Sequence, residues 1–299
     1  MRRFIIFLVL PWFLGATKYA GEFQELGAGA RILAMGGAGI AQGVDPSVLY
    51  FNPAGTLFIL RGIHLMHAEN FGGLIKNEFG SLVIPRTDAA LGLGFQLLTA
   101  SGIKFTTLPD TTRPPGIDNP PYAYDTVAAK DAIVYLNAAR GNGMFAFGGN
   151  LKIYYRDLVS ISGFGGGLDL GVDLNLEYLK FGLAVRDFVL SPIVWSNGTR
   201  ETIASKLALG VAPVIPLEKL NSQITLECDF LKYLDRAGFA VNVGFELAYH
   251  NFLFGRLGIN QGNFTLGAGL RYKKFILDYA FVTNSFLKDS NKFSAGLEF

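Results

Sequence analysis

The chain has 299 residues, half of them apolar and 17% charged, which excludes a disordered polymer. The formal net charge is +2, and basic and acidic residues are scattered along the chain, so no basic stripe indicates a nucleic-acid partner. The single cysteine, Cys228, excludes an internal disulfide framework. We therefore expect no metal site and no cofactor.

Residues 1–20 have the pattern of a secretory signal peptide. Two arginines precede an apolar run over residues 4–14, and this run is too short for a membrane-spanning helix, which needs about 20 residues. We therefore expect export, with a mature chain that begins between Thr17 and Gly21.

The rest of the chain is dominated by alternation of apolar and polar residues with a period of two. In residues 168–177, for example, leucines and a valine alternate with acidic, amide and glycine residues, as in a strand with two unlike faces. Cys228 falls in the apolar row of another such run. The pattern predicts fourteen strands, at 62–70, 77–84, 89–100, 131–140, 143–156, 165–176, 179–188, 204–214, 221–231, 237–249, 251–260, 263–272, 274–283 and 291–299.

The even strand count and the alternation of short turns with longer connections are typical of a transmembrane β-barrel of the bacterial outer membrane, surrounded by outer-membrane lipid. A soluble β-sandwich is the alternative, because alternation alone does not say whether the apolar face meets a core or lipid. The predicted export signal and the loop alternation favour the barrel. The final strand ends at Phe299 and resembles the signal by which the barrel-assembly machinery recognises such proteins.

Two connections are long enough for a functional role. Residues 101–130 contain five prolines and are predicted to form an irregular external lid, and residues 191–202 form the second candidate loop. We expect apolar side chains in these loops to collect a hydrophobic ligand, namely Phe105, Leu108, Phe164 and Trp195.

Residues 21–60 do not alternate. Asp45 is predicted as an N-cap with Pro46 at the first helical position, and the helix is expected to end at Asn52-Pro53-Ala54-Gly55. A small, partly helical segment ahead of a barrel can fold into the lumen, so we predict an N-terminal plug, or hatch. Its glycine-rich stretch over residues 36–39 is interpreted as packing inside the hatch, because it lacks the features of a phosphate-binding loop.

Three stretches of this segment carry a family resemblance. Residues 21–31, Ala34-Met35-Gly36-Gly37-Ala38 and Asn52-Pro53-Ala54-Gly55 resemble the amino-terminal signature of the PorV/PorQ family, within the FadL-like superfamily of fourteen-stranded barrels with a hatch. This chain departs from the pattern at Gly43-Val44-Asp45, where paired acidic residues are frequent, and at Phe51, where tryptophan is common. The resemblance implies either passage of hydrophobic molecules, as in fatty-acid transporters, or a role in type IX secretion, as in PorV-like proteins.

Charged residues on the polar strand faces are expected to point into the lumen. We interpret them as a structural network that holds the hatch to the wall, with Arg31 as its principal anchor, because one guanidinium can bridge several carboxylates. The predicted lumen-facing residues are Lys152, Asp169, Asp173, Lys180, Arg186, Glu227, Glu246, Arg271 and Asp278.

The sequence thus predicts a signal peptide (1–20), a hatch (21–60) and an all-β, fourteen-stranded antiparallel barrel (61–299). The hatch and gate residues are Arg31, Asp45, Asn52, Pro53, Ala54 and Gly55. Only His64 could serve as a base in the lumen, so we expect no enzyme. The first hypothesis is hatch-gated transport of hydrophobic small molecules, as through a specialised porin. The second is a secretion component that receives an exported protein.

Overall fold

The computed structural model describes residues 21–188 and 191–299, most of which lie in antiparallel strands, so the predicted leader falls outside the described residues. The helices are the 3-10 helices η1 (Glu22–Leu26), η2 (Pro53–Phe58) and η3 (Glu218–Leu220), and the α-helices α1 (Ala30–Ala34) and α2 (Val48–Phe51). The strands are β1 (Gly62–Asn70), β2 (Ile75–Pro85), β3 (Ala89–Thr107), β4 (Tyr122–Gly141), β5 (Phe145–Asp157), β6 (Ser162–Asn175), β7 (Leu179–Arg186), β8 (Ser191–Trp195), β9 (Arg200–Ile203), β10 (Lys206–Leu217), β11 (Ser222–Tyr233), β12 (Ala240–Tyr249), β13 (Leu253–Asn260), β14 (Asn263–Tyr272), β15 (Phe275–Val282) and β16 (Ser290–Glu298).

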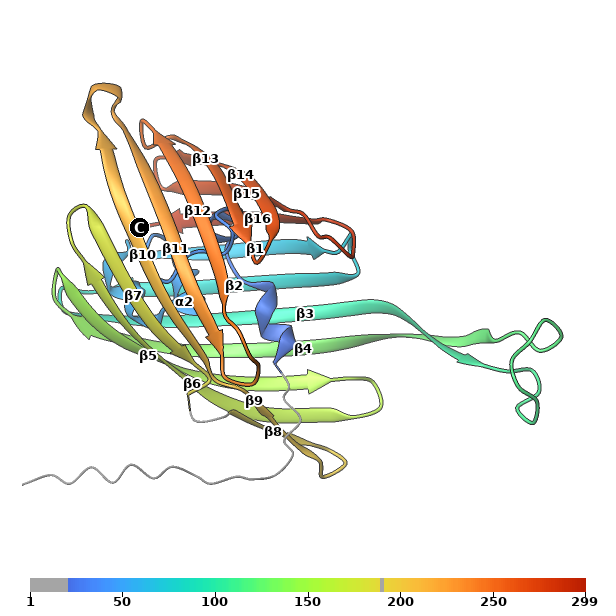
Figure 1. The fold of residues 1–299 in the computed structure, drawn as a ribbon. Helices are drawn as coiled ribbons and strands as arrows, with labels where there is room; N and C mark the ends of the chain where they lie inside the picture. Colours follow the sequence, from blue (N-terminus) through green and yellow to red (C-terminus); the bar gives the residue numbers. More distant parts are fainter. Residues whose placement is uncertain (1–20, 189–190) are drawn as a thin grey trace, which may run out of the picture.

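Fourteen of the strands in the described residues form a closed barrel (Figure 1). Neighbours in the chain pair antiparallel, β7 pairs with β10 across the intervening connection, and β1 pairs with β16 to complete the ring. Closure leaves the wall without a free edge. The predicted number of strands and the predicted fold class are confirmed.

The two faces of the wall have opposite chemistry. On β11, outward-facing Leu226 and Phe230 are 40% and 47% exposed, whereas inward-facing Glu227 and Asp229 are 1% and 0% exposed. Cys228 lies in the outward row, as predicted. A soluble sandwich would bury the apolar face instead, so the wall has the inverted pattern of a transmembrane barrel.

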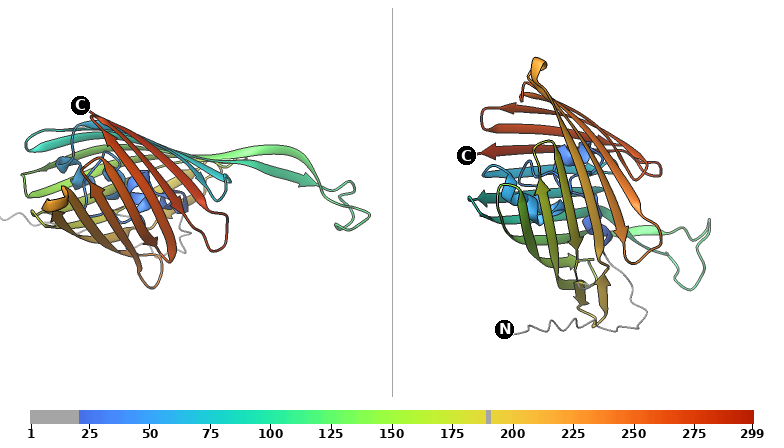
Figure 2. Two further views of the ribbon diagram at one scale, coloured as in Figure 1. Left: turned by 90° about the horizontal axis from the view of Figure 1, so that it is seen from above. Right: turned by 60° about the vertical axis from the view of Figure 1, so that its left-hand side comes forward.

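Residues 101–130 were predicted to form an irregular loop, and this prediction was wrong for both ends of the range. β3 continues to Thr107 and β4 starts at Tyr122, and the two strands stay paired with two irregularities along a projecting hairpin (Figures 1 and 2). All five prolines fall within residues 108–121. The residues that flank this tip keep their backbone donors and include Thr and Tyr, which favour strands.

The prediction of a loop over residues 191–202 was also wrong. It forms the hairpin of β8 and β9, and β8 pairs with β6 outside the closed ring of strands. The turn contains Asn197-Gly198, a dipeptide typical of hairpin turns, and Gly198 adopts a φ of +84°. The Asn-Gly dipeptide is visible in the sequence, but the hairpin that it indicates was not predicted.

Residues 21–60, called the N-terminal segment below, lie inside the ring of strands (Figure 2). Helices of four to six residues are too short to be stable alone, so contacts with the wall hold them. α1 packs against β13–β16, and η2 packs against β2–β6. None of the helices in the described part of the chain is long and apolar enough to cross a membrane.

Candidate functional site: the barrel lumen and its N-terminal segment

Arg31 on α1 ties the N-terminal segment to β12. Its Nε and Nη2 atoms donate to the two carboxylate oxygens of Glu246 at 2.7 and 2.6 Å. Glu246 also accepts from Arg256, whose other donor binds Asp278 at 2.6 Å. Burial would lower the pKa of the Arg31 guanidinium, but Glu246 and Asp45 raise it above its usual value. The predicted anchor is therefore a charged, bidentate contact within a buried network.

The glycine-rich stretch after α1 binds carboxylates of the wall. The amide groups of Gly39 and Ile40 donate to Asp229 Oδ2 at 2.8 and 3.2 Å, and the amide of Ala41 donates to Glu227 Oε1 at 2.8 Å. Successive backbone amides of this kind form an anion-binding nest. The stretch packs inside the barrel as expected, but no local pattern indicated that two lumen carboxylates would bind its amides.

Gly36 shows why this stretch needs glycine. Its φ is +71°, and a Cβ atom there would lie 2.6 Å from the carbonyl oxygens of Val243 and Ile259 on the wall. The amide of Gly36 donates to Thr265 Oγ1 at 2.9 Å. The backbone of the segment therefore lies directly against β12–β14.

Asn52 joins two parts of the N-terminal segment to β6. Its Nδ2 donates to the carbonyl oxygens of Ile40 and Val172 at 2.8 and 3.1 Å, and its Oδ1 accepts from the amide of Ala54 at 3.1 Å. The carbonyl oxygen of Pro53 accepts from Asn137 on β4 at 3.1 Å. The side chains of Asn52 and Asn137 are buried, so the predicted Asn-Pro-Ala motif lies at the contact between segment and wall.

The wall opposite this motif carries small residues. A Cβ atom at Gly148 of β5 would lie 2.7 Å from the backbone of Pro53, and one at Gly171 of β6 would clash with the Asn52 side chain. The glycines therefore let the motif approach the backbone of the wall. Gly55, the last of the predicted gate residues, is buried within η2 and does not adopt a positive φ.

Asp45 does not cap α2, which corrects the prediction. The helix starts at Val48 with Ser47 in the N-cap position, and Pro46 lies in the preceding turn. Asp45 Oδ1 accepts from the amide of Ser47 at 2.8 Å and lies 3.6 Å from His64 Nδ1 on β1. Burial would raise the pKa of Asp45, but His64 and the Ser47 hydrogen bonds lower it below its usual value. Asp45 thus orders a tight turn and faces a buried histidine.

A second buried network surrounds Lys152 on β5. Its Nζ lies 2.7 Å from Asp169, 2.8 Å from Asp187 and 3.1 Å from Gln24 Oε1 in the N-terminal segment. Lys152 is fully buried, and such a cation is tolerated only with charged partners. Gln24 and Asp187 were not among the predicted site residues, because only the closed fold brings them to Lys152.

Glu25 makes a further polar contact between the N-terminal segment and the wall. The contact lies at the end of the barrel that carries the longer connections, called the long-loop end below. Its Oε2 lies 2.7 Å from Lys206 Nζ on β10 and accepts from the Tyr233 hydroxyl on β11 at 2.7 Å. Burial would raise the pKa of Glu25, but Lys206 and Arg186 lower it to about 2. This carboxylate therefore stays ionised and was missed at the sequence level.

All nine predicted lumen charges face inward, although two of them, Lys180 and Arg271, are only half-buried near the short-turn end. Arg271 binds Glu298 at 3.0 Å. Arg186 lies 4.3 Å above the Tyr50 ring. Asp173 is 1% exposed and has no hydrogen-bond partner among the described residues.

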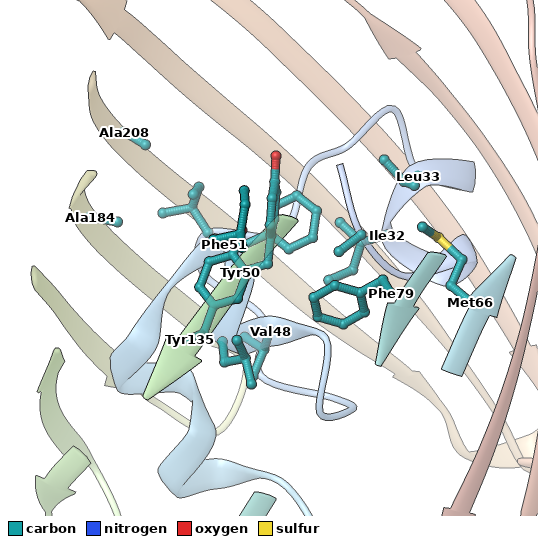
Figure 3. Close-up of a cluster of buried hydrophobic side chains, with 14 of the residues drawn as sticks. Ile32, Leu33, Val48, Tyr50, Phe51, Met66, Phe79, Tyr135, Ala184 and Ala208 are labelled. Carbon is teal, nitrogen blue, oxygen red and sulfur yellow. The ribbon is translucent and has the colours of Figure 1, made fainter. Parts of the chain in front are cut away.

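The lumen also contains a buried aromatic and apolar cluster between the N-terminal segment and the wall (Figure 3). On β2, β3 and β4 this cluster is interspersed with the buried polar side chains of Asn77, Gln96 and Asn137. Tyr50 of α2 packs edge-to-face against Phe79 on β2 and Tyr135 on β4, with ring centroids 6.5 and 6.4 Å apart. Phe51 lies 4.8 Å from Tyr50, and Met66 on β1 extends the buried cluster. Polar and charged residues dominate the rest of the inner wall.

Open space in the lumen is uneven along the barrel axis. A cavity of about 480 Å³ lies at the short-turn end, lined in part by Arg31, Gln42 and Lys180. At the long-loop end, crevices of about 50 and 40 Å³ run between the N-terminal segment and the wall, beside Arg186 and Lys206. The segment therefore narrows the lumen most on the loop side.

The four predicted ligand-collecting residues do not form one site. Phe105 lies on the β3 extension, with its ring 6.3 Å from Tyr124, and Leu108 starts the proline-rich tip. Phe164 lies on β6 and faces outward, whereas Trp195 is buried on β8, with the Arg156 guanidinium 5.5 Å from its ring. Three of these residues, Phe105, Phe164 and Trp195, lie in strands over ranges that were predicted as loops or loop margins, and this placement separates them.

The terminal aromatic residue packs on the start of the barrel. The amide of Phe299 donates to the carbonyl oxygen of Arg61 at 2.9 Å, and the Arg61 guanidinium lies 4.8 Å from the Phe299 ring, which is 47% exposed. Among residues 21–188 and 191–299, no group of three or more His, Cys, Asp or Glu residues is arranged to hold a metal ion.

Comparisons with known proteins support the fold. No family model matches the sequence, and a search of curated proteins finds no match. The P. putida toluene transporter TodX shares 11% identity at a TM-score of 0.59, over 91% of this chain and 99% of that chain. A TodX deltaS2S3 mutant, described as a monoaromatic hydrocarbon channel, shares 11% identity at a TM-score of 0.56 over the same fractions. This similarity shows a shared barrel fold, while the FadL-like and PorV/PorQ resemblances stay predictions.

Proposed function

We propose that this protein is a bacterial outer-membrane barrel that passes hydrophobic small molecules, with the N-terminal segment as its hatch. The apolar outer face fits a position in lipid, and the fold is shared with a toluene transporter. The observation that carries the proposal is the aromatic and apolar cluster on the inner wall, where Tyr50 of the segment packs against Phe79 on β2 and Tyr135 on β4. Porin-like barrels have polar interiors, so this wall favours an apolar cargo.

The hatch has to move for passage. The crevices at the loop end, about 50 and 40 Å³, are far below the 300 to 1,000 Å³ typical of small-molecule sites. Displacement of α2 would expose Phe79, Tyr135 and the other apolar side chains of this cluster. The polar contacts of Arg31 and Asn52 would then set the free energy of opening.

Uptake into proteoliposomes tests the proposal. We expect the wild-type barrel to admit toluene faster than a hydrophilic sugar of similar size. Leu98→Gln, in this cluster on β3, should slow toluene uptake several-fold, because a buried amide without a partner costs about 1–3 kcal/mol. Leu98→Met, which keeps an apolar side chain of similar volume at the same position, is the matched control and should leave toluene uptake unchanged.

Heat-dependent mobility in gels would verify that each variant is folded. Equal entry of sugar and toluene, or an uptake no faster than in protein-free vesicles, would contradict the proposal. The secretion alternative stays a prediction, and it would gain support from a stoichiometric exported protein that copurifies with the barrel. Recognition by the assembly machinery through Phe299 and the lack of catalysis also stay predictions.

A further inference from the structure

The cavity of about 480 Å³ at the short-turn end lies between the N-terminal segment and the wall. The segment lines it with Arg31, Gln42 and Val44, and the wall contributes Lys180 on β7 and Thr225 on β11, among others. Its volume falls within the range of roughly 300 to 1,000 Å³ that is typical of small-molecule sites. An apolar cargo would gain little here, because most of the lining side chains carry amide, hydroxyl or charged groups.

Three nitrogen donors of this lining have no partner among the residues that the structure describes. Lys180 is half-buried and forms neither a hydrogen bond nor an ion pair. Gln42 is 3% exposed, and its Nε2 atom is buried without a partner. Arg31 donates to Glu246 through Nε and Nη2, which leaves its Nη1 unengaged. Donors without partners are uncommon at buried sites, so their grouping around one cavity indicates a ligand with acceptor atoms.

The charges at the cavity favour an anion. Arg31 and Lys180 are both cations, and the carboxylate in the described lining, Glu177, is exposed in the turn between β6 and β7. Asp173 and Glu227 attract Lys180 from the wall, but they do not line the cavity and form no ion pair with Lys180. Two cations and an amide that donate from different sides match an oxyanion, which can accept several hydrogen bonds at once.

We propose that this cavity binds a small, water-soluble organic molecule that bears a carboxylate or phosphate group, with Lys180 as its main charged contact. Arg31 and Gln42 donate to the same ligand from the N-terminal segment, so the ligand bridges segment and wall. At the proposed location the short turns face the periplasm, and the ligand is a solute of that compartment.

The bridge gives the ligand an effect on the hatch. Opening of the segment removes the donors of Arg31 and Gln42 from the site, so the bound anion stabilises the closed position of the segment. The stabilisation grows with the ratio of ligand concentration to dissociation constant. This effect rests on the proposed movement of the hatch, whereas binding of the anion does not.

Isothermal titration calorimetry of the folded barrel in detergent tests the site with succinate, glycerol 3-phosphate and the neutral analogue succinamide. We expect at least one of the two anions to bind once per chain, at least tenfold tighter than succinamide, and their order of affinity identifies the preferred oxyanion. Lys180→Gln should weaken anion binding about tenfold or more, as expected for loss of a charged hydrogen bond. Lys219→Gln, on the exposed helix η3 at the same end of the barrel but outside the cavity, is the matched control and should bind as the wild type does.

A second variant separates shape from charge. Val214 lines the cavity from β10, and Val214→Phe should abolish anion binding by filling the space while it keeps every charged group. Hydrogen exchange then tests the bridge. With anion at about ten times its dissociation constant, amides of residues 39–44 should exchange about tenfold more slowly in the wild type and keep their rates in Lys180→Gln.

Equal affinity for succinamide and the anions would overturn the proposal, as would the absence of saturable anion binding. Anion binding that survives Lys180→Gln or Val214→Phe in folded barrels would overturn it too. Unchanged exchange in the anion-loaded wild type would refute the bridge between segment and wall. A barrel that passes toluene but binds no anion contradicts this site alone, whereas one that binds the anion but excludes toluene contradicts the proposed function alone.

Discussion

Replacing Asn52 should loosen the N-terminal segment without unfolding the barrel. In Asn52→Ala, the carbonyl oxygens of Ile40 and Val172 and the amide of Ala54 lose their partner inside the lumen. At about 1 kcal/mol for each hydrogen bond, the loss is about 3 kcal/mol. Opening of the segment should then become about a hundredfold more frequent. The wall keeps its own interstrand hydrogen bonds, so its stability should change little.

Hydrogen exchange and single-channel conductance measure this effect. Amides of residues 39–54 should exchange about a hundredfold faster in Asn52→Ala, wall amides should keep their rates, and basal conductance should rise. Asn284→Ala is the matched control, because Asn284 accepts two backbone hydrogen bonds in an exposed loop. Unchanged exchange and conductance in a folded Asn52→Ala barrel would refute the reasoning that Asn52 holds the hatch.

Three further substitutions probe the same contacts. Arg31→Gln removes the bidentate pair with the β12 carboxylate and should speed exchange in α1, for a loss of about 2 kcal/mol; unchanged exchange would exclude an anchoring role. Gly36→Ala should lower the urea midpoint more than Gly73→Ala, because both adopt a positive φ but only the former meets wall backbone; equal shifts would contradict this. The pKa of Glu25 is lowered from 4.5 to about 2, so the stability from its contact with Lys206 is full above pH 4.5 and lost as the pH falls toward 2. The difference in thermal midpoint between wild type and Glu25→Gln should shrink as the pH falls from 4.5 toward 2. A constant difference would contradict a stabilising ion pair between Glu25 and Lys206.

Local pattern determined the fourteen barrel strands, apart from the extensions of β3 and β4, and in most of them the two faces. The alternation on β11 places Glu227 and Asp229 on one face and Leu226 and Phe230 on the other, because successive side chains of a strand point to opposite sides. A period of two needs no tertiary information. The sequence also indicated the Asn52 motif and the cationic role of Arg31, since proline and a guanidinium have strong local or chemical preferences.

Tertiary structure decided which residues meet. The partner of Arg31 is 215 residues away in the sequence, and the glycine-rich stretch is held by carboxylates about 190 residues away. Such pairings depend on register and closure, which no local pattern encodes. The same holds for the aromatic and apolar cluster of the lumen, because the alternation on β2 is too weak to assign Phe79 to a face until β1 and β3 fix its register. Sequence thus determined the elements and their chemistry, while closure of the ring determined the site, because only closure brings distant strands around a common interior.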